Sequence, residues 1–374
     1  MKGSAVYLVL LHSFILLKNT TMYKKFLIVF GFLLVVPYFV HAQPAQNNSD
    51  VNAFLQKKNA GLAYNKGIDN VRAGKYQEAA ANFTAAITAN PSFDLAYLQR
   101  GKVKFQLSDY KGALDDINKA LQINGNMGEA YFCLGYTKLV SDSTHAKFDY
   151  FDKAVQNGFA EPFVYYYRGV LKAYKKDYQG AVNDLSTAIE KKPDYTFAYF
   201  DRGCVRFMSN DFQGAIYDFR QVLYYDSTLV AAYNNMANAK TYTGDYQGAI
   251  NDLTKLIAKK SNNAMAFNNR GCAKYQLSDY PGAAEDFKAS LNINEKYSSA
   301  YNNFANDTAK LGDYKTAIEY FNKALKINPD FAIAILNRGL VKELTGDLDG
   351  ACSDWKSAAK MGNADGARYM KECK

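Results

Sequence analysis

Residues with side chains suited to catalysis are scarce in this chain of 374 residues. Only one of its three histidines, His145, lies beyond residue 42. A single histidine excludes a His-rich metal site and disfavours a Ser–His or Cys–His nucleophile, so we interpret His145 as a turn residue. The sequences G-x-x-x-x-G-K-[ST], H-E-x-x-H and G-x-S-x-G do not occur. We therefore predict no enzyme, no catalytic residue and no cofactor.

A period of 34 residues organises the chain. The stretch "YLQRGKVKFQLSDY", which begins at Tyr97, recurs five periods later as "FNNRGCAKYQLSDY" at Phe267, with eight of fourteen letters unchanged. Self-similarity at a fixed period indicates a repeat array. Small residues recur at this step without an insertion, and we assign them to position 8 of each repeat: Gly67, Gly101, Gly135, Gly169, Gly203, Ala237, Gly271, Ala305 and Gly339.

Several other repeat positions also have a physical interpretation. Position 4 is aromatic in seven repeats, position 20 is alanine in eight, and position 16 is aspartate in seven. Small residues at positions 8 and 20 let two helices approach closely, and the ring at position 4 fills the remaining space. Aspartate at position 16 can cap the second helix, and proline at position 32, present in three repeats, can end it. Each repeat is therefore predicted to be a pair of helices, A and B.

The pattern resembles the tetratricopeptide repeat (TPR) family, and the resemblance covers residues 60–361 as nine repeats. It implies an all-α fold, a right-handed α-α superhelix (TPR solenoid) of nine tandem 34-residue helix-turn-helix repeats, with helix A lining the concave face. Each repeat should contact mainly its neighbours. The third repeat has Lys147 in place of alanine at position 20, which suggests a bend or looser packing near residues 141–162.

Position 7, leucine in the family, is arginine in five repeats, and each of these has aspartate at position 23. Where position 7 is Leu134 or Phe304, position 23 is Tyr150 or Tyr320, and only the sixth repeat breaks the correlation. Position 11 is basic in seven repeats, and we interpret it as part of a structural ion-pair stripe instead of a ladder for an anionic polymer. The predicted Arg–Asp pairs are Arg100–Asp116, Arg168–Asp184, Arg202–Asp218, Arg270–Asp286 and Arg338–Asp354.

The five cysteines lack the spacing of a zinc site, so no metal site is predicted. Cys204 and Cys272 occupy position 9 of repeats two steps apart, too distant to be bonded. If residues 363–372 fold back along the last helix B, Cys373 would meet Cys352. An oxidising compartment would favour a disulfide there, and the alternative is two buried free thiols.

Residues 1–42 have the pattern of a targeting leader. From Met22 the sequence carries two lysines, an apolar stretch at residues 26–40 and an A-x-A-like site that ends at Ala42. That stretch is short for a membrane span and Pro37 interrupts it. A second apolar stretch precedes it, so we expect Met22 to be the true start. The predicted protein is bacterial and exported, periplasmic or extracellular, without a stable membrane span after signal cleavage.

The remaining boundaries and the charge follow from the same pattern. We expect a linker and short N-terminal helix at residues 43–59 and a capping helix at residues 362–374. The formal charge of +9 includes four leader lysines, and the rest of the chain has 41 basic and 36 acidic residues. Such a mild and dispersed excess argues against a nucleic-acid partner.

The concave surface of TPR proteins is lined chiefly by positions 2, 5, 6, 9, 12 and 13 of helix A. No repeat has the basic residues at positions 2 and 5 or 6 that would clamp a terminal carboxylate. The asparagines at position 6 look like the asparagine ladder of O-GlcNAc transferases, and amides match the N–H and C=O groups of an extended peptide. The alternative is a founding repeat with asparagine that was copied. The candidate ladder comprises Asn234, Asn235, Asn238, Asn268, Asn269, Asn302, Asn303, Asn306 and Asn337.

Aromatic residues replace asparagine at these positions in the second to fifth repeats. They could stack on sugars or accept apolar peptide side chains, and the alternative is ordinary packing between repeats. The candidates are Tyr136, Tyr166, Tyr167 and Phe200. Together these features predict a non-catalytic protein–protein interaction scaffold that binds an extended peptide or protein partner in its groove in the cell envelope. A structural or glycan-associated envelope component, or an auxiliary subunit of an enzyme or secretion complex, is the alternative.

Overall fold

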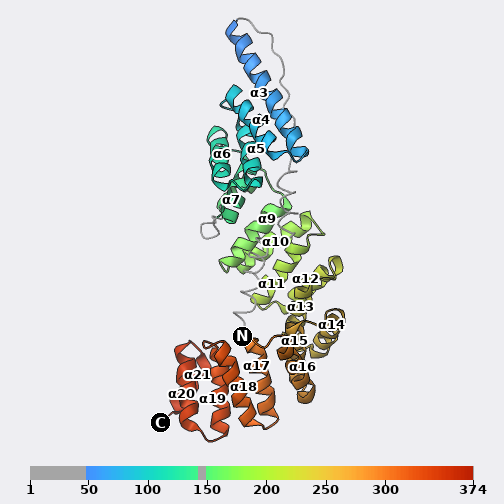
Figure 1. Ribbon diagram of the computed structural model, residues 1–374, viewed down its shortest axis with the longest axis vertical. Coiled ribbons are helices and arrows are strands. Elements are labelled where there is room, and N and C mark those ends of the chain that lie inside the picture. Colours follow the sequence, from blue (N-terminus) through green and yellow to red (C-terminus); the bar gives the residue numbers. More distant parts are fainter. Residues whose placement is uncertain (1–47, 142–148, 374) are drawn as a thin grey trace. The chain divides into compact units, whose positions relative to one another are not determined.

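The computed structural model describes residues 48–141 and 149–373, and every regular element in these residues is a helix (Figure 1). The predicted all-α TPR solenoid is confirmed. The leader at residues 1–42, His145 and Lys147 lie outside the described residues. The described chain forms two compact units, which divide between residues 198 and 199.

The first unit contains the first four repeats. Its helices are α3 (Asn48–Arg72), α4 (Tyr76–Ala89), α5 (Asp94–Gln106), α6 (Tyr110–Ile123), α7 (Gly128–Ser141), α8 (Asp149–Gln156), α9 (Pro162–Tyr174) and α10 (Tyr178–Lys191). The boundary falls within α11 (Thr196–Met208), the first helix of the fifth repeat. Helix B of the third repeat, α8, is described from Asp149 onward, because residues 142–148 lie outside the described part of the chain.

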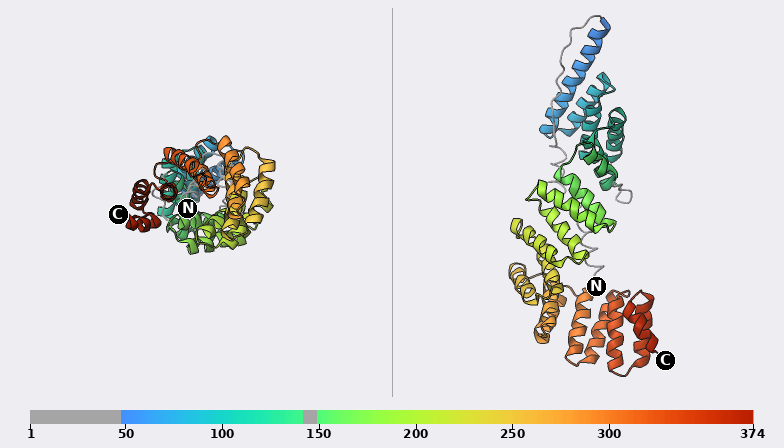
Figure 2. Two further views of the ribbon diagram at one scale, coloured as in Figure 1. Left: turned by 90° about the horizontal axis from the view of Figure 1, so that it is seen from below. Right: turned by 180° about the vertical axis from the view of Figure 1, so that it is seen from behind.

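The second unit contains the rest of the array. Its helices are α12 (Phe212–Tyr225), α13 (Val230–Tyr242), α14 (Tyr246–Lys259), α15 (Ala264–Gln276), α16 (Tyr280–Ile293), α17 (Ser298–Lys310), α18 (Tyr314–Ile327), α19 (Ala332–Leu344), α20 (Leu348–Lys360) and α21 (Ala364–Tyr369), followed by the 3-10 helix η2 (Met370–Glu372). Figure 2 shows the hairpins α17/α18 and α19/α20 side by side, as expected for stacked repeats.

The N-terminal helix is longer than predicted. Instead of a linker and a separate short helix before residue 60, α3 runs without a break from Asn48 to Arg72. Residues 51–60 are rich in alanine, leucine, glutamine and lysine and contain neither proline nor glycine, so nothing ends the helix before helix A of the first repeat.

Helix B begins at the predicted aspartate cap. The side chain of the position 16 aspartate accepts a hydrogen bond from the backbone N–H three residues later in all seven repeats that have it. Such a cap stabilises a helix by about 1 kcal/mol. The residue before the cap has a positive φ in eight repeats, and in four of these it is not glycine: Ser108, Lys176, Asn210 and Ser278.

The core of each hairpin lies where positions 8 and 24 meet. Position 24 is a large apolar residue in every repeat, and all nine side chains are buried. A methyl group added at Gly271 would lie 2.8 Å from the ring of Phe287, so the small residue at position 8 is required for this close approach.

Candidate partner-binding surface

The ion pairs predicted between helices A and B are confirmed. In the seventh repeat, Arg270 donates from Nε and Nη2 to the two carboxylate oxygens of Asp286, at 2.9 and 2.7 Å. The second, fourth and ninth repeats have the same bidentate arrangement at 2.6–2.9 Å. In the fifth repeat, Arg202 contacts both oxygens of Asp218, whose burial nevertheless raises its pKa above the usual value. Parallel N–H···O bonds of this kind fix geometry strongly.

Four of these arginines also reach the preceding repeat, a contact that was not predicted. The third guanidinium nitrogen, Nη1, donates to position 25 of the preceding helix B at 2.6–3.1 Å. A signal was available, because position 25 carries an acceptor before these arginines. The four pairs are Arg100–Thr84, Arg168–Asp152, Arg270–Thr254 and Arg338–Asn322.

The basic residues of position 11 are already paired. Six of them lie 2.6–3.0 Å from the position 23 carboxylate of their own repeat, including Lys240 with Asp252 in the repeat that lacks the arginine. The seventh, Lys138, lies over the ring of Tyr150 at 5.3 Å. These cations therefore form a structural stripe, as predicted, and not an uncommitted ladder for an anionic polymer.

Three of the candidate asparagines lie beneath the surface, which corrects their predicted role in partner contact. Asn234, Asn268 and Asn302, at position 5, are only 1–4% exposed. The reason is that helix A of the following repeat packs over this position, an arrangement that Asn303 and Asn337 demonstrate by donating to Asn268 and Asn302. The asparagines at positions 6 and 9 are partly exposed.

The asparagine amides form a continuous hydrogen-bonded chain through three repeats. Asn337 donates from Nδ2 to Oδ1 of Asn302 at 3.3 Å, and Asn302 donates to Asn303 at 3.1 Å. Asn303 in turn donates to Asn268 at 3.0 Å, and Asn268 to Asn269 at 3.3 Å. Because every link is Nδ2 to Oδ1, the chain fixes the orientation of each amide.

The hydrogen-bonded chain of asparagines ends between the sixth and seventh repeats. Asn234 Oδ1, the equivalent of the acceptors on Asn268 and Asn302, is buried and receives no hydrogen bond. Asn269, which occupies the donor position, leaves both Nδ2 hydrogens unused, and Asn238 and Asn306 at position 9 make no side-chain hydrogen bond within the described residues. This surface of helix A in the second unit therefore keeps both donors and acceptors for a partner.

The four candidate aromatic residues are buried, which corrects their predicted role in partner contact. Tyr136, Tyr166, Tyr167 and Phe200 are at most 9% exposed. Tyr136 packs between Phe105 and Tyr167, at ring-centroid distances of 5.5 and 5.1 Å. These rings fill the spaces between helices, so the packing alternative is the one observed.

The unpaired cysteines are not suited to reaction. Cys133 and Cys204 are buried, and burial raises the pKa of both thiols. Burial also raises the pKa of Cys272 to about 12, and Asn303 donates to its sulfur at 3.2 Å. Since the thiolate is the reactive form, these residues act as small packing groups, and Cys204 and Cys272 lie beside asparagines.

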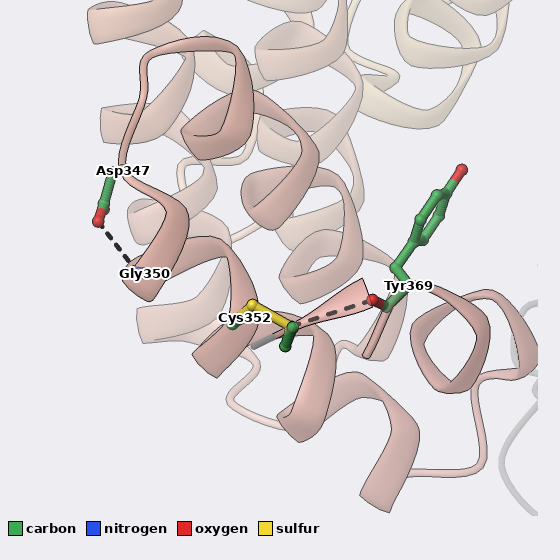
Figure 3. The surroundings of a disulfide bond; sticks show 5 residues. Asp347, Gly350, Cys352 and Tyr369 are labelled. Carbon is green, nitrogen blue, oxygen red and sulfur yellow. Dashed lines mark hydrogen bonds between the residues drawn. A yellow bond between two sulfur atoms is a disulfide. The ribbon is translucent and has the colours of Figure 1, made fainter. Parts of the chain in front are cut away.

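The last two cysteines form a disulfide bond. Cys352 in α20 and Cys373 after η2 have sulfur atoms 2.01 Å apart and Cα atoms 5.7 Å apart, as Figure 3 shows near the Asp347–Gly350 cap of α20. The bond holds the short α21 segment against α20, where the ring of Tyr369 packs 5.3 Å from Trp355. The end of the array is thus closed by a covalent link and an aromatic contact.

Within the described residues, no group of three or more histidine, cysteine, aspartate or glutamate side chains is placed to hold a metal ion. No helix among residues 48–141 and 149–373 is long and apolar enough to cross a membrane.

Family models described as tetratricopeptide repeat match residues 64–127, 234–300 and 299–331. These matches fall in register with the repeats seen in the structure. The chain is a TPR protein. A TPR chain of this kind is a scaffold for protein–protein interaction, and such scaffolds are typically non-catalytic.

Several solved structures are similar to this TPR protein. The crystal structure of the APC/C hetero-tetramer Cut9–Hcn1 matches with a TM-score of 0.51 and 13% identity, over 84% of this chain and 76% of that one. MamA matches with 25% identity and a TM-score of 0.37, over 44% and 95% of the two chains. Pseudomonas aeruginosa PilF matches with 19% identity and a TM-score of 0.46, over 57% and 97%. No curated protein matches the sequence.

Proposed function

We propose that this TPR protein binds an extended segment of a partner protein along helix A of repeats six to nine, in the cell envelope. The oriented asparagine chain is the observation that supports this proposal most. Asparagine within a helix costs up to roughly 0.7 kcal/mol relative to alanine, so the six that are partly exposed at positions 6 and 9 support a function in partner binding. Their hydrogen-bonding capacity is only partly used inside the protein.

The hydrogen-bond pattern defines what each asparagine offers to a peptide. Asn303 uses both Nδ2 hydrogens, on Asn268 and Cys272, and so offers mainly an acceptor. Asn269 offers two donors. Neighbouring A helices are about 10 Å apart, which corresponds to about three residues of an extended chain. Backbone C=O and N–H groups of a peptide would alternate along this surface without a demand on peptide sequence.

Export to the envelope rests on the leader pattern and on the disulfide, since a bond between Cys352 and Cys373 persists in an oxidising compartment. The glycan-associated alternative loses its main support because the aromatic rings at the same positions are buried. An auxiliary subunit of an enzyme or secretion complex is compatible with the same peptide-binding surface.

Site-specific photo-crosslinking in intact cells tests this function. A photoreactive amino acid at Asn306, whose side chain makes no hydrogen bond within the described residues, should capture a specific partner at a defined peptide. The matched control is the same photoreactive amino acid at Lys356, an exposed residue of α20. The proposal fails if Asn306 captures nothing that Lys356 does not, and intact-mass analysis of the native protein checks cleavage after Ala42.

A further inference from the structure

The solvent-exposed side of α12 carries an aromatic cluster around an arginine. Tyr217, Arg220 and Tyr224 follow one helix face at steps of three and four residues, and the two rings are 51% and 78% exposed. Tyr225, 42% exposed, extends the cluster by contacting Tyr224 at 5.1 Å and the buried Tyr199 at 6.1 Å. We call Tyr217, Arg220, Tyr224 and Tyr225 the tyrosine–arginine face.

The other repeats serve as internal controls for this face. Positions 22 and 29, where Tyr217 and Tyr224 lie, are occupied elsewhere by alanine, serine, threonine, asparagine, glutamine, lysine or acidic residues, and never by an aromatic residue. The repeat fold therefore does not require rings at these positions. Exposed clusters of this kind usually mark an interaction surface.

Arg220 is the one arginine among the described residues with no hydrogen bond, ion pair or ring contact. The equivalent Lys288 of the seventh repeat lies over Phe304, at position 7 of the next repeat, at 5.8 Å. Arg220 has no such ring, because position 7 of the next repeat is Met236. The only carboxylate within α12, Asp218, is buried against Arg202 and Arg206.

We infer that the tyrosine–arginine face is a second protein-binding surface, which accepts an acidic segment of a partner protein. An uncommitted guanidinium between two exposed phenol rings matches a carboxylate that is flanked by apolar groups. Tyrosine and arginine are enriched among the residues that dominate protein interfaces. The rings lie about 10 Å apart along one helix ridge, a spacing that the grooves of a packed protein element can accept. This surface is separate from the asparagine chain of helix A.

The test measures binding of a fluorescent random copolymer of glutamate and tyrosine to the purified full chain, by anisotropy at low salt. Arg220→Glu should weaken binding about tenfold or more, and Tyr217→Ser with Tyr224→Ser should weaken it similarly. The matched control, Lys356→Glu, makes the same charge change at position 25 of the ninth repeat and should change binding less than about twofold.

Three outcomes would overturn the inference. Equal losses from Arg220→Glu and Lys356→Glu would show general charge attraction, and no loss from either would show that the face is not used. Polygalacturonate, an acidic polysaccharide, is the second probe, and stronger Arg220-dependent binding to it than to the copolymer would replace a protein partner by a glycan. In a background with Asn238→Ala and Asn306→Ala, Arg220→Glu should still weaken copolymer binding by the same factor, so this result stands apart from the test of the asparagine surface.

Discussion

Asp307 is the residue that least fits its surroundings. It occupies position 10 of the eighth repeat, where the second to seventh and the ninth repeats have valine, threonine, leucine or alanine. It is buried, and neither carboxylate oxygen has a hydrogen-bond partner. Burial, together with the nearby Asp279, raises its pKa to about 6. Burial raises the pKa of Tyr275, and the nearby Tyr280 and Asp307 raise it further.

This aspartate predicts a stability that falls as the pH rises. The folded state holds the proton more tightly than the unfolded chain, whose aspartate pKa is near 3.9, so stability is lost as the pH rises from about 4 through 6. Asp307→Asn keeps the shape and removes the charge, and should raise the melting temperature at pH 8 but not at pH 4. Thermal melts at pH 4 and pH 8 measure this change in melting temperature, and Asp330→Asn, at an exposed aspartate, is the control. Equal effects of Asp307→Asn at the two pH values would contradict the account.

The Arg–Asp pairs predict a non-additive mutation pattern. Asp286→Ala leaves Arg270 and Lys274 half-buried without their carboxylate. The free energy of unfolding should therefore fall by about 3 kcal/mol. The double variant Arg270→Leu with Asp286→Tyr reproduces the Leu134 and Tyr150 pair of the third repeat, where Lys138 lies over the tyrosine ring. It should be more stable than Asp286→Ala in urea unfolding. An equal or larger loss in the double variant would show that the ion pair does not act as a unit.

At the scale of elements, the repeat pattern predicts where helices begin far better than how they end. Aspartate at position 16 marks the start of helix B correctly, because a cap is a local interaction written in the sequence. The extension of α3 to Asn48 was missed because nothing in the repeat pattern describes residues before the first repeat. The positive φ of Lys176 was missed as well, since lysine gives no sign of a left-handed turn.

The C-terminal element should depend on its disulfide. Closing a loop across 21 residues stabilises the folded chain by about 3 kcal/mol in the chain-entropy view. Because repeats contact mainly their neighbours, Cys373→Ser should increase amide hydrogen exchange in α20 and α21 and leave α15 and α16 unchanged. Exchange measured by mass spectrometry, with and without reductant, checks this. Protection of α20 that does not respond to either change would contradict a stabilising role.

At the scale of the whole molecule, the fold was predictable because one pattern recurs nine times. The recurrence identifies the helix pair even where a single repeat departs from the pattern. The partner surface was predictable only in part. Whether an asparagine at position 5 or 6 is exposed depends on the helix that the next repeat places over it, which a single repeat does not encode. The same holds for Tyr136 and Tyr167, whose rings meet across a repeat boundary. In contrast, the sequence alone shows that position 25 carries a hydrogen-bond acceptor wherever position 7 of the next repeat is arginine.

The asparagine surface is the central claim, and affinity enrichment from envelope extract tests it most directly. The wild-type chain would be compared with a variant that has alanine at Asn235, Asn269, Asn303 and Asn337, after circular dichroism has shown that both are folded. The account predicts a defined partner that the wild type captures and the variant loses, while Lys356→Ala retains it. Identical captures by the wild type and the asparagine variant would contradict peptide binding along helix A of repeats six to nine.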